Sequence, residues 1–481
     1  MHNNRWLALI VLCLGTLMII LDSTIVNVAL PSIQRDLGFS QSSLTWVVNA
    51  YLIPFGGLLL LAGRMGDLLG RKRIFIAGLA VFSAASLLCG IANTQELLIA
   101  ARFIQGAGGA LTSAVVLGMI VNMFPAPAER ARAIGVYSFV ASAGASLGLL
   151  LGGALTQTMS WHWIFFVNLP IGLATALWAL RLLTPEPGAG LQNGADIPGA
   201  IAIVGALMVG VYTIIEASTY GWLSSHTLTF GAIAATLLIG FVIRQASTRN
   251  PLVPLRVFRS RTLSTANVVQ ALMVAGLFGM FFLGVLYLQR VLGYDAIETG
   301  VAFLPVSLTI GVLSLGFSAR LNMRFGARAT LLPGLALIVA GLALFARAPV
   351  DGSYVVDVLP VMFLLGIGAG LSFPSLMTLA MSGATQSDSG LASGLVNTSL
   401  QVGGALGLAV LATLSSTRTD TLLADGEPLK DALTGGYHLA FIVAASLVAL
   451  AIVFATTVLQ ASPAVEEEEA PASESALIEA A

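Results

Sequence analysis

Long apolar runs, each near 20 residues, dominate this chain and alternate with short polar segments. A helix of that length crosses the roughly 30 Å hydrocarbon core of a bilayer. The runs are apolar on every face, whereas the strands of a membrane barrel alternate polar and apolar positions. Because backbone groups in lipid must be hydrogen-bonded internally, the remaining choice is a bundle of helices. The pattern therefore predicts an all-α polytopic membrane protein.

Fourteen such spans can be counted. Their predicted bounds are 6–29, 43–62, 74–92, 97–121, 133–156, 162–183, 197–216, 227–244, 263–288, 297–317, 329–346, 355–378, 390–415 and 436–459. A Pro- and Gly-rich segment, 184–195, precedes the seventh span, and a basic segment, 244–261, follows the eighth. These two segments set the seventh and eighth spans apart as an insertion.

Composition agrees with this pattern and excludes several classes of protein. Charged residues are only 9% of the chain, against about 25% in soluble domains, and the mean hydropathy is +0.93. The net charge of −1 gives no basis for nucleic-acid binding. The sequence contains no phosphate-binding loop of the Gly-x-x-x-x-Gly-Lys-Ser/Thr type, and no catalytic or metal-ligating cluster stands out. We expect a protein without cofactor or metal that is driven by an ion gradient, and not an enzyme.

Cations are distributed unevenly between the two ends of the spans. If the N-terminus is cytoplasmic, 16 of the 22 lysines and arginines fall on the cytoplasmic side. Cations accumulate in cytoplasmic loops, so both termini are predicted to be cytoplasmic. The last segment, 460–481, contains four consecutive glutamates followed by Pro, Ala and Ser, and is expected to be disordered because it is too polar to pack.

The densest charge cluster lies between the second and third spans and reads Gly63-Arg-Met-Gly66-Asp67-Leu-Leu-Gly70-Arg71-Lys-Arg73. A degenerate copy, 319–328, aligns with it at a constant offset of 256 residues, which places Gly326 on Gly70 and Arg328 on Lys72. The copy indicates two related halves. We infer an N-terminal half at 6–183, a linker with two inserted helices at 184–261, and a C-terminal half at 262–459.

The spacing of this charged loop resembles a signature of the major facilitator superfamily. Four further stretches resemble its branch of fourteen-helix drug/proton antiporters, and they run over 21–31, 102–110, 161–172 and 390–404. The resemblance implies two six-helix bundles plus two inserted helices. It also implies a secondary transporter that exports lipophilic, often cationic drugs or toxic compounds in exchange for protons by alternating access.

One stretch departs from that branch. In the fifth span, Gly144, Gly148 and Gly152 lie four residues apart on one helix face, which allows another helix to approach closely. The antiporters have proline directly after the second glycine, where this chain has Leu149. The packing role of the glycines is unaffected, but the expected proline kink is absent.

Asp22 is the leading functional candidate, because a carboxylate inside a span costs roughly 2.5–3.5 kcal/mol and usually faces the bundle interior. It can carry a proton, or it can bond neighbouring backbone in a purely structural role. Arg102 and Gln105 share one face of the fourth span, which we expect to line a cavity. The alternative is that Arg102 extends to the outer headgroups. Counting along the helices puts Asp22 and Arg102 at similar depth. The resemblance implies that the first and fourth helices surround one central cavity, so we expect the two side chains to face it and to be coupled.

The remaining candidates have two interpretations each. The charged loop, with Gly63, Gly66, Asp67, Gly70 and Arg71, is expected to control conformational switching through contacts between the halves, or else is simply solvated. A polar group of the second and thirteenth spans either contacts cargo or holds helices together, and it consists of Asn49, Asn397 and Gln401. Glu216 is expected at a membrane interface.

The sequence thus indicates a secondary transporter of a bacterial inner or plasma membrane, functional as a monomer. Its expected partners are a small lipophilic substrate, protons and the lipid bilayer. One alternative is a transporter of the same fold for a defined metabolite, lipid or siderophore. An intramembrane enzyme or receptor is a second alternative, although the chain offers no catalytic set for it.

Overall fold

The computed structural model describes residues 2–185, 187–188, 190, 194–382 and 389–459. Within these residues the chain is helical and contains no strand. The first seven helices are α1 (His2–Leu37), α2 (Trp46–Leu69), α3 (Arg71–Gly90), α4 (Gln95–Met123), α5 (Pro127–Thr158), α6 (Trp163–Phe166) and α7 (Asn168–Leu182). Two more, α8 (Ile197–Tyr220) and α9 (Ser225–Ser247), form a hairpin.

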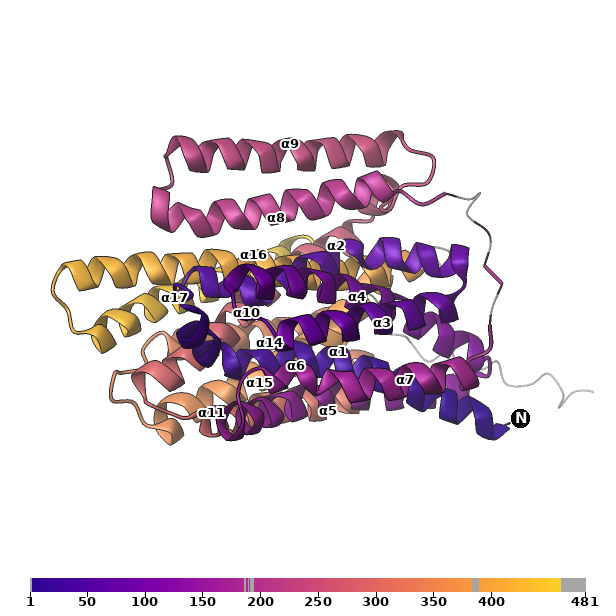
Figure 1. Ribbon diagram of the computed structural model, residues 1–481, viewed down its shortest axis with the longest axis horizontal. Helices are drawn as coiled ribbons and strands as arrows, with labels where there is room; N and C mark the ends of the chain where they lie inside the picture. The colour runs from indigo at the N-terminus through magenta and orange to yellow at the C-terminus, as the bar shows by residue number, and fades with distance from the viewer. Residues whose placement is uncertain (1, 186, 189, 191–193, 383–388, 460–481) are drawn as a thin grey trace, which may run out of the picture.

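The remaining helices are α10 (Arg261–Leu286), α11 (Ala296–Ala302), α12 (Leu304–Val312), α13 (Ser318–Phe325), α14 (Ala327–Phe345), α15 (Leu359–Ser382), α16 (Ser389–Ala424) and α17 (Leu429–Thr457). Short π-helical turns follow α10 and α12 and precede α15, at 287–291, 313–317 and 354–358. The long helices run side by side along one axis (Figure 1). We call the end where α1 begins and α2 ends the basic side, after Arg5, Arg64 and Arg71, and the other end the opposite side.

Twelve of the described helices are long and apolar enough to cross a membrane. The fifth and the tenth predicted spans are not among these twelve. The fifth lies on α5, which has 32 residues, and the tenth lies on the run from α11 to α13. Each of the fourteen predicted spans therefore lies on a helix or a helical run. The tenth is interrupted after Ala302, because Pro305 in the first turn of α12 has no N–H to continue the preceding helix.

The repeat at an offset of 256 residues has a structural counterpart. Gly70 and Gly326 each end a helix with a positive φ, 96° and 87°, which glycine adopts without strain. The cation two positions later then bonds free carbonyls at the end of a distant helix. Lys72 Nζ donates to the carbonyl oxygens of Leu180 (2.8 Å) and Leu183 (2.5 Å) at the end of α7. Arg328 does the same at the end of α17, where its Nε and Nη2 donate to the carbonyls of residues 455 and 456 at 3.2 and 2.6 Å.

The α8–α9 hairpin lies beside the main bundle, with α9 at the outer edge (Figure 1). Asp196 holds its base together: the carboxylate caps α8 through the N–H of Gly199 (3.0 Å) and accepts from Arg244 Nε (2.5 Å) and Gln245 Nε2 (2.7 Å). Burial raises the pKa of Asp196, but these three hydrogen bonds outweigh it and leave the pKa below its usual value. Since α8 packs on both α2 and α16, the hairpin covers the contact between those two helices.

The three glycines of α5 pack against α1. A Cβ on Gly144 would lie 2.9 Å from Leu17 Cδ1, and one on Gly152 would lie 2.6 Å from the carbonyl oxygen of Ile25. A Cβ on Gly148 would collide with Thr24 Oγ1. The absence of side chains on this face therefore lets α5 lie directly on the α1 backbone, without the help of a proline at 149.

Helices of the two halves meet closely on the opposite side, at the ends of α5 and α11. Gln157 Nε2 donates to Asp295 Oδ2 (3.0 Å), and Gln157 Oε1 accepts from the N–H of Ile297 (3.2 Å). The N–H of Glu298, helped by Gln157, holds the pKa of Asp295 below its usual value. A Cβ on Gly153 would lie 2.6 Å from the carbonyl oxygen of Ala296. We call this contact the α5–α11 clasp.

Candidate functional site

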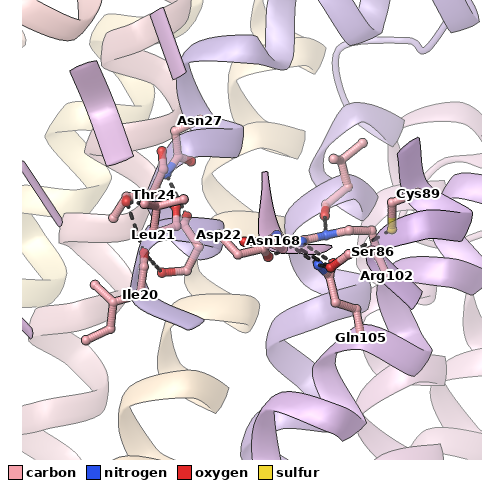
Figure 2. A network of polar contacts seen from close by, with 12 residues as sticks. Ile20, Leu21, Asp22, Thr24, Asn27, Ser86, Cys89, Arg102, Gln105 and Asn168 are labelled. Atoms are coloured by element: carbon pink, nitrogen blue, oxygen red, sulfur yellow. Dashed lines mark hydrogen bonds and ion pairs between the residues drawn. The ribbon is translucent and has the colours of Figure 1, made fainter. Parts of the chain in front are cut away.

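A polar network around Asp22 lies inside the helices of the N-terminal part. Asp22 is 0% exposed and its carboxylate accepts three hydrogen bonds. Oδ2 accepts from Arg102 Nη1 at 2.5 Å, while Oδ1 accepts from Gln105 Nε2 at 2.7 Å and from Asn168 Nδ2 at 2.8 Å. Figure 2 shows Asp22 reaching from α1 toward these residues on α4 and α7. Asp22 and Arg102 therefore form a buried ion pair.

Arg102 is buried, with 1% exposure, so it does not extend to a headgroup region. Its Nε donates to the carbonyl oxygen of Val47 (2.9 Å), and Nη1 donates to Gln105 Oε1 (2.7 Å) as well as to Asp22. The guanidinium carbon lies 4.4 Å from the ring centroid of Tyr51, at a distance typical of a cation–π contact. The cation is thus held between a carboxylate, a helix backbone and an aromatic ring.

Ser86 and Cys89 of α3 complete the network. Ser86 Oγ accepts from Gln105 Nε2 at 2.8 Å, and Cys89 Sγ lies 3.7 Å from Gln105 Oε1. Helices α1, α3, α4 and α7 each contribute a polar side chain, so the network joins four helices through buried hydrogen bonds. Burying polar groups is costly unless they are paired, and these side chains bond one another, although Asn168 Oδ1 has no partner among the described residues.

A cavity of about 220 Å³ lies next to this network, between α1, α2, α4 and α5 on one side and α10, α12 and α16 on the other. Its wall from α10 is aromatic, with Phe278, Phe281 and Phe282. The polar part of the lining comes mainly from Ser23, Thr24, Asn27, Tyr51 and Arg102. The volume is below the roughly 300–1,000 Å³ of drug-sized sites, so the cavity must widen to hold a drug-sized compound.

Comparison with known proteins now decides the family. A family model described as Major Facilitator Superfamily matches residues 12–408. The chain belongs to this superfamily.

Two bacterial relatives cover nearly the whole chain. The puromycin resistance protein of Streptomyces alboniger is 38% identical over 98% of this chain and 94% of that protein. The cephamycin export protein of Amycolatopsis lactamdurans is 35% identical over 94% of this chain and 92% of that protein. The nucleoside transporter NupG has a TM-score of 0.68, covers 94% of this chain and 100% of its own, and at 13% identity shares only the fold. Membership in the superfamily makes the protein a multi-pass membrane transporter and not an enzyme.

For a transporter, the position of Asp22 relative to the cavity matters, and here the prediction was partly wrong. Arg102 lines the cavity, but Asp22 does not. The carboxylate points into the bundle because Gln105 and Asn168 hold Oδ1 from the side away from Arg102 Nη1. Through its ion pair with Arg102, Asp22 contacts the wall of the cavity.

In the charged loop, the side chains of Asp67 and Arg71 join α2 to α3 and α4. Asp67 Oδ1 pairs with Arg71 Nη2 at 3.1 Å, one helical turn away, and Asp67 remains 51% exposed. Arg71 Nη1 also donates to the carbonyl oxygen of Gly118 in α4 (3.2 Å). Among the described residues, Asp67 makes no ion pair across the halves in this conformation. Gly66 packs against Val115, whereas Gly63 has open space around it.

Asn49, Asn397 and Gln401 were candidates for cargo contact, and none of them lines the cavity. Gln401 lies on the α2–α16 contact, where its Cβ would be 2.6 Å from a Cβ on Gly56. Asn49 is fully buried in α2, and neither the oxygen nor the nitrogen of its amide has a hydrogen-bond partner in the described part of the chain. The structure favours the packing interpretation for Gln401.

Sequence reasoning did not select Ser86, Asn168 or the three α10 phenylalanines. Asn168 and the α1 residues Ser23, Thr24 and Asn27 do lie within stretches 161–172 and 21–31, which carried the family resemblance. Their polar side chains inside apolar spans were the available signal. The phenylalanines gave none, because aromatic residues are common in any apolar span.

Proposed function

We propose that the protein exports lipophilic, drug-like compounds from a bacterial cell by alternating access, in exchange for protons. Asp22 is the proton-binding group in this proposal, and Arg102 with Gln105 transmits its state to the cargo cavity. The names of two relatives, a puromycin resistance protein and a cephamycin export protein, support drug export.

The observation that supports coupling most directly is the position of Arg102, which bonds Asp22 with one nitrogen and lines the cavity. All side chains bonded to the Asp22 carboxylate are donors, which suits its ionised form. A proton on Oδ2 would compete with Arg102 Nη1 for the same oxygen. Proton uptake would therefore release Arg102, and the wall of the cavity would change.

The membrane setting follows the same proposal. We place the protein in the bacterial plasma membrane with the basic side and both termini in the cytoplasm, since 16 of the 22 lysines and arginines then lie on the inner side. The functional unit is one chain of two six-helix halves, with the α8–α9 hairpin inserted between them. Reporter domains fused after positions 188 and 250 should both read cytoplasmic, and an external reading at either would refute this orientation.

Drug uptake into inverted membrane vesicles tests the proposal. An acid-inside pH gradient should drive uptake of puromycin or chloramphenicol in the wild type, and Asp22→Asn should abolish the gradient-driven part. Asp420, exposed on α16, provides the control Asp420→Asn, which should transport normally. Because a lone Arg102 charge destabilises Asp22→Asn, the double variant Asp22→Asn/Arg102→Gln gives a second uncoupled form.

The outcomes separate the two parts of the proposal. Gradient-driven uptake that persists in Asp22→Asn would refute Asp22 as the proton carrier. Absence of uptake and of resistance for every antibiotic in a panel would refute drug export and favour a transporter of a defined metabolite.

A further inference from the structure

The cavity lining contains one charged side chain, and it is a cation. Arg102 is that residue, and no Asp or Glu is among the residues that line the cavity. The nearest carboxylate in the network, Asp22, is fully buried and its oxygens are taken by Arg102, Gln105 and Asn168. A molecule in the cavity therefore meets the cationic end of the Arg102–Asp22 ion pair, while the carboxylate lies behind the wall.

Arg102 also keeps unused donors. A guanidinium has five N–H groups. The Nε and Nη1 donors of Arg102 bond Val47, Asp22 and Gln105. No hydrogen bond of Nη2 occurs among the described residues, although the residue as a whole is buried at the cavity wall. Two N–H groups are thus left for an acceptor that enters the cavity.

The polar side chains that α1 contributes to the wall have already used donors, whereas the Tyr51 hydroxyl of α2 has no hydrogen-bond partner among the described residues. Ser23 Oγ and Thr24 Oγ1 donate to the carbonyl oxygen of Ile20, at 2.8 and 3.0 Å. Asn27 Nδ2 donates to the carbonyl oxygens of Ser23 and Thr24, at 3.2 and 3.4 Å. These α1 side chains therefore offer weak acceptors to a ligand, and none of them supplies the negative charge that a cationic ligand needs.

Apolar recognition comes from the facing helices. Phe278, Phe281 and Phe282 of α10 form an aromatic wall, and Leu149 of α5 extends it at the position where related antiporters have proline. Flat aromatic surfaces stack well against such rings. The cavity thus combines one strong donor with a broad aromatic surface.

We infer that the preferred cargo is an uncharged aromatic compound that presents a hydrogen-bond acceptor, such as a carbonyl or phosphoryl oxygen, to Arg102. Cationic cargo is disfavoured, because it meets the Arg102 charge in a site of low dielectric constant. The inference rests on the proposed export function and narrows it: the often cationic cargo implied by the family resemblance does not suit this cavity.

Two probes with the same triphenylphosphorus body separate the chemistries. Triphenylphosphine oxide is neutral with a strong acceptor, and methyltriphenylphosphonium is a permanent cation without one. Binding to the full-length protein in nanodiscs can be measured by calorimetry. We expect triphenylphosphine oxide to bind at least tenfold more tightly. Phe281→Leu should weaken both probes by a similar factor, whereas Arg102→Lys, which keeps the charge and loses Nη2, should weaken triphenylphosphine oxide alone.

Equal or tighter binding of methyltriphenylphosphonium would overturn the inference, and so would failure of both probes to bind. An unchanged preference in a folded Arg102→Lys protein would overturn the role of Nη2. These outcomes leave drug export standing if vesicles still accumulate puromycin or chloramphenicol, so failure of the inference and failure of the export proposal are distinguishable.

Discussion

Replacing Asp22 by Asn should reveal how strongly the buried network depends on its charge balance. The asparagine keeps an oxygen for Gln105 and Asn168, but its NH₂ group faces Arg102 Nη1, where an acceptor stood at 2.5 Å. Arg102, at 1% exposure, is left as an unpaired buried cation. Removing one partner of a buried ion pair costs about 3–5 kcal/mol, and we expect Asp22→Asn to be destabilised by this amount.

A double-mutant cycle measures the coupling. Arg102→Gln alone leaves the Asp22 charge unpaired and should cost about as much. The double variant Asp22→Asn/Arg102→Gln removes both charges, so it should be more stable than the sum of the single effects by about 1–3 kcal/mol. Unfolding of the purified protein in mixed micelles by added sodium dodecyl sulfate gives the free energies, with Asp420→Asn as the neutral control. Additive effects would refute the claim that these two charges stabilise each other.

Three further predictions concern other parts of the molecule. Asp196→Ala should destabilise the hairpin by about 1–2 kcal/mol through loss of a helix cap and its partners. Since the pKa of Asp196 is lowered in the folded state, wild-type stability should be retained above the usual carboxyl pKa of 3.8 and fall as the pH drops toward the folded value. An equal thermal midpoint for Asp196→Ala and wild type at neutral pH would contradict this prediction. Gly153→Val should hold the α5–α11 clasp open, because a Cβ there lies 2.6 Å from a backbone oxygen; spin labels at the ends of both helices should report a longer distance, and an unchanged distance would show that the clasp tolerates the side chain. Asp67→Asn and Arg71→Ala should leave the protein inserted but slow transport, as measured by initial uptake rates in vesicles, and normal rates in both would mean that the loop is only solvated.

Much of the fold was predictable because the bilayer imposes a simple rule on sequence. A span must be about 20 apolar residues long, so span positions, the hairpin insertion and the all-helical class follow from counting. The packing face of the α5 glycines and the 256-residue repeat could also be predicted from the sequence, since small residues and turn glycines occur in few structural roles. Asp22 and Arg102 stood out because charge is rare inside spans and must find a partner there.

Only the tertiary structure decided which way these groups point. The sequence placed Asp22 and Arg102 at a similar depth in the membrane. The rotation of α1 and α4 about their axes turns Asp22 away from the cavity, so that of these two residues only Arg102 lines it. The same holds for Asn49 and the phenylalanines of α10: each is a residue type whose role depends on which helix lies opposite. Helix periodicity shows which residues of one span share a face, but the packing of separate spans decides which residues of other helices they contact. In lipid the buried and the lipid-facing sides of a helix are both apolar, so the sequence does not show which side packs against another helix.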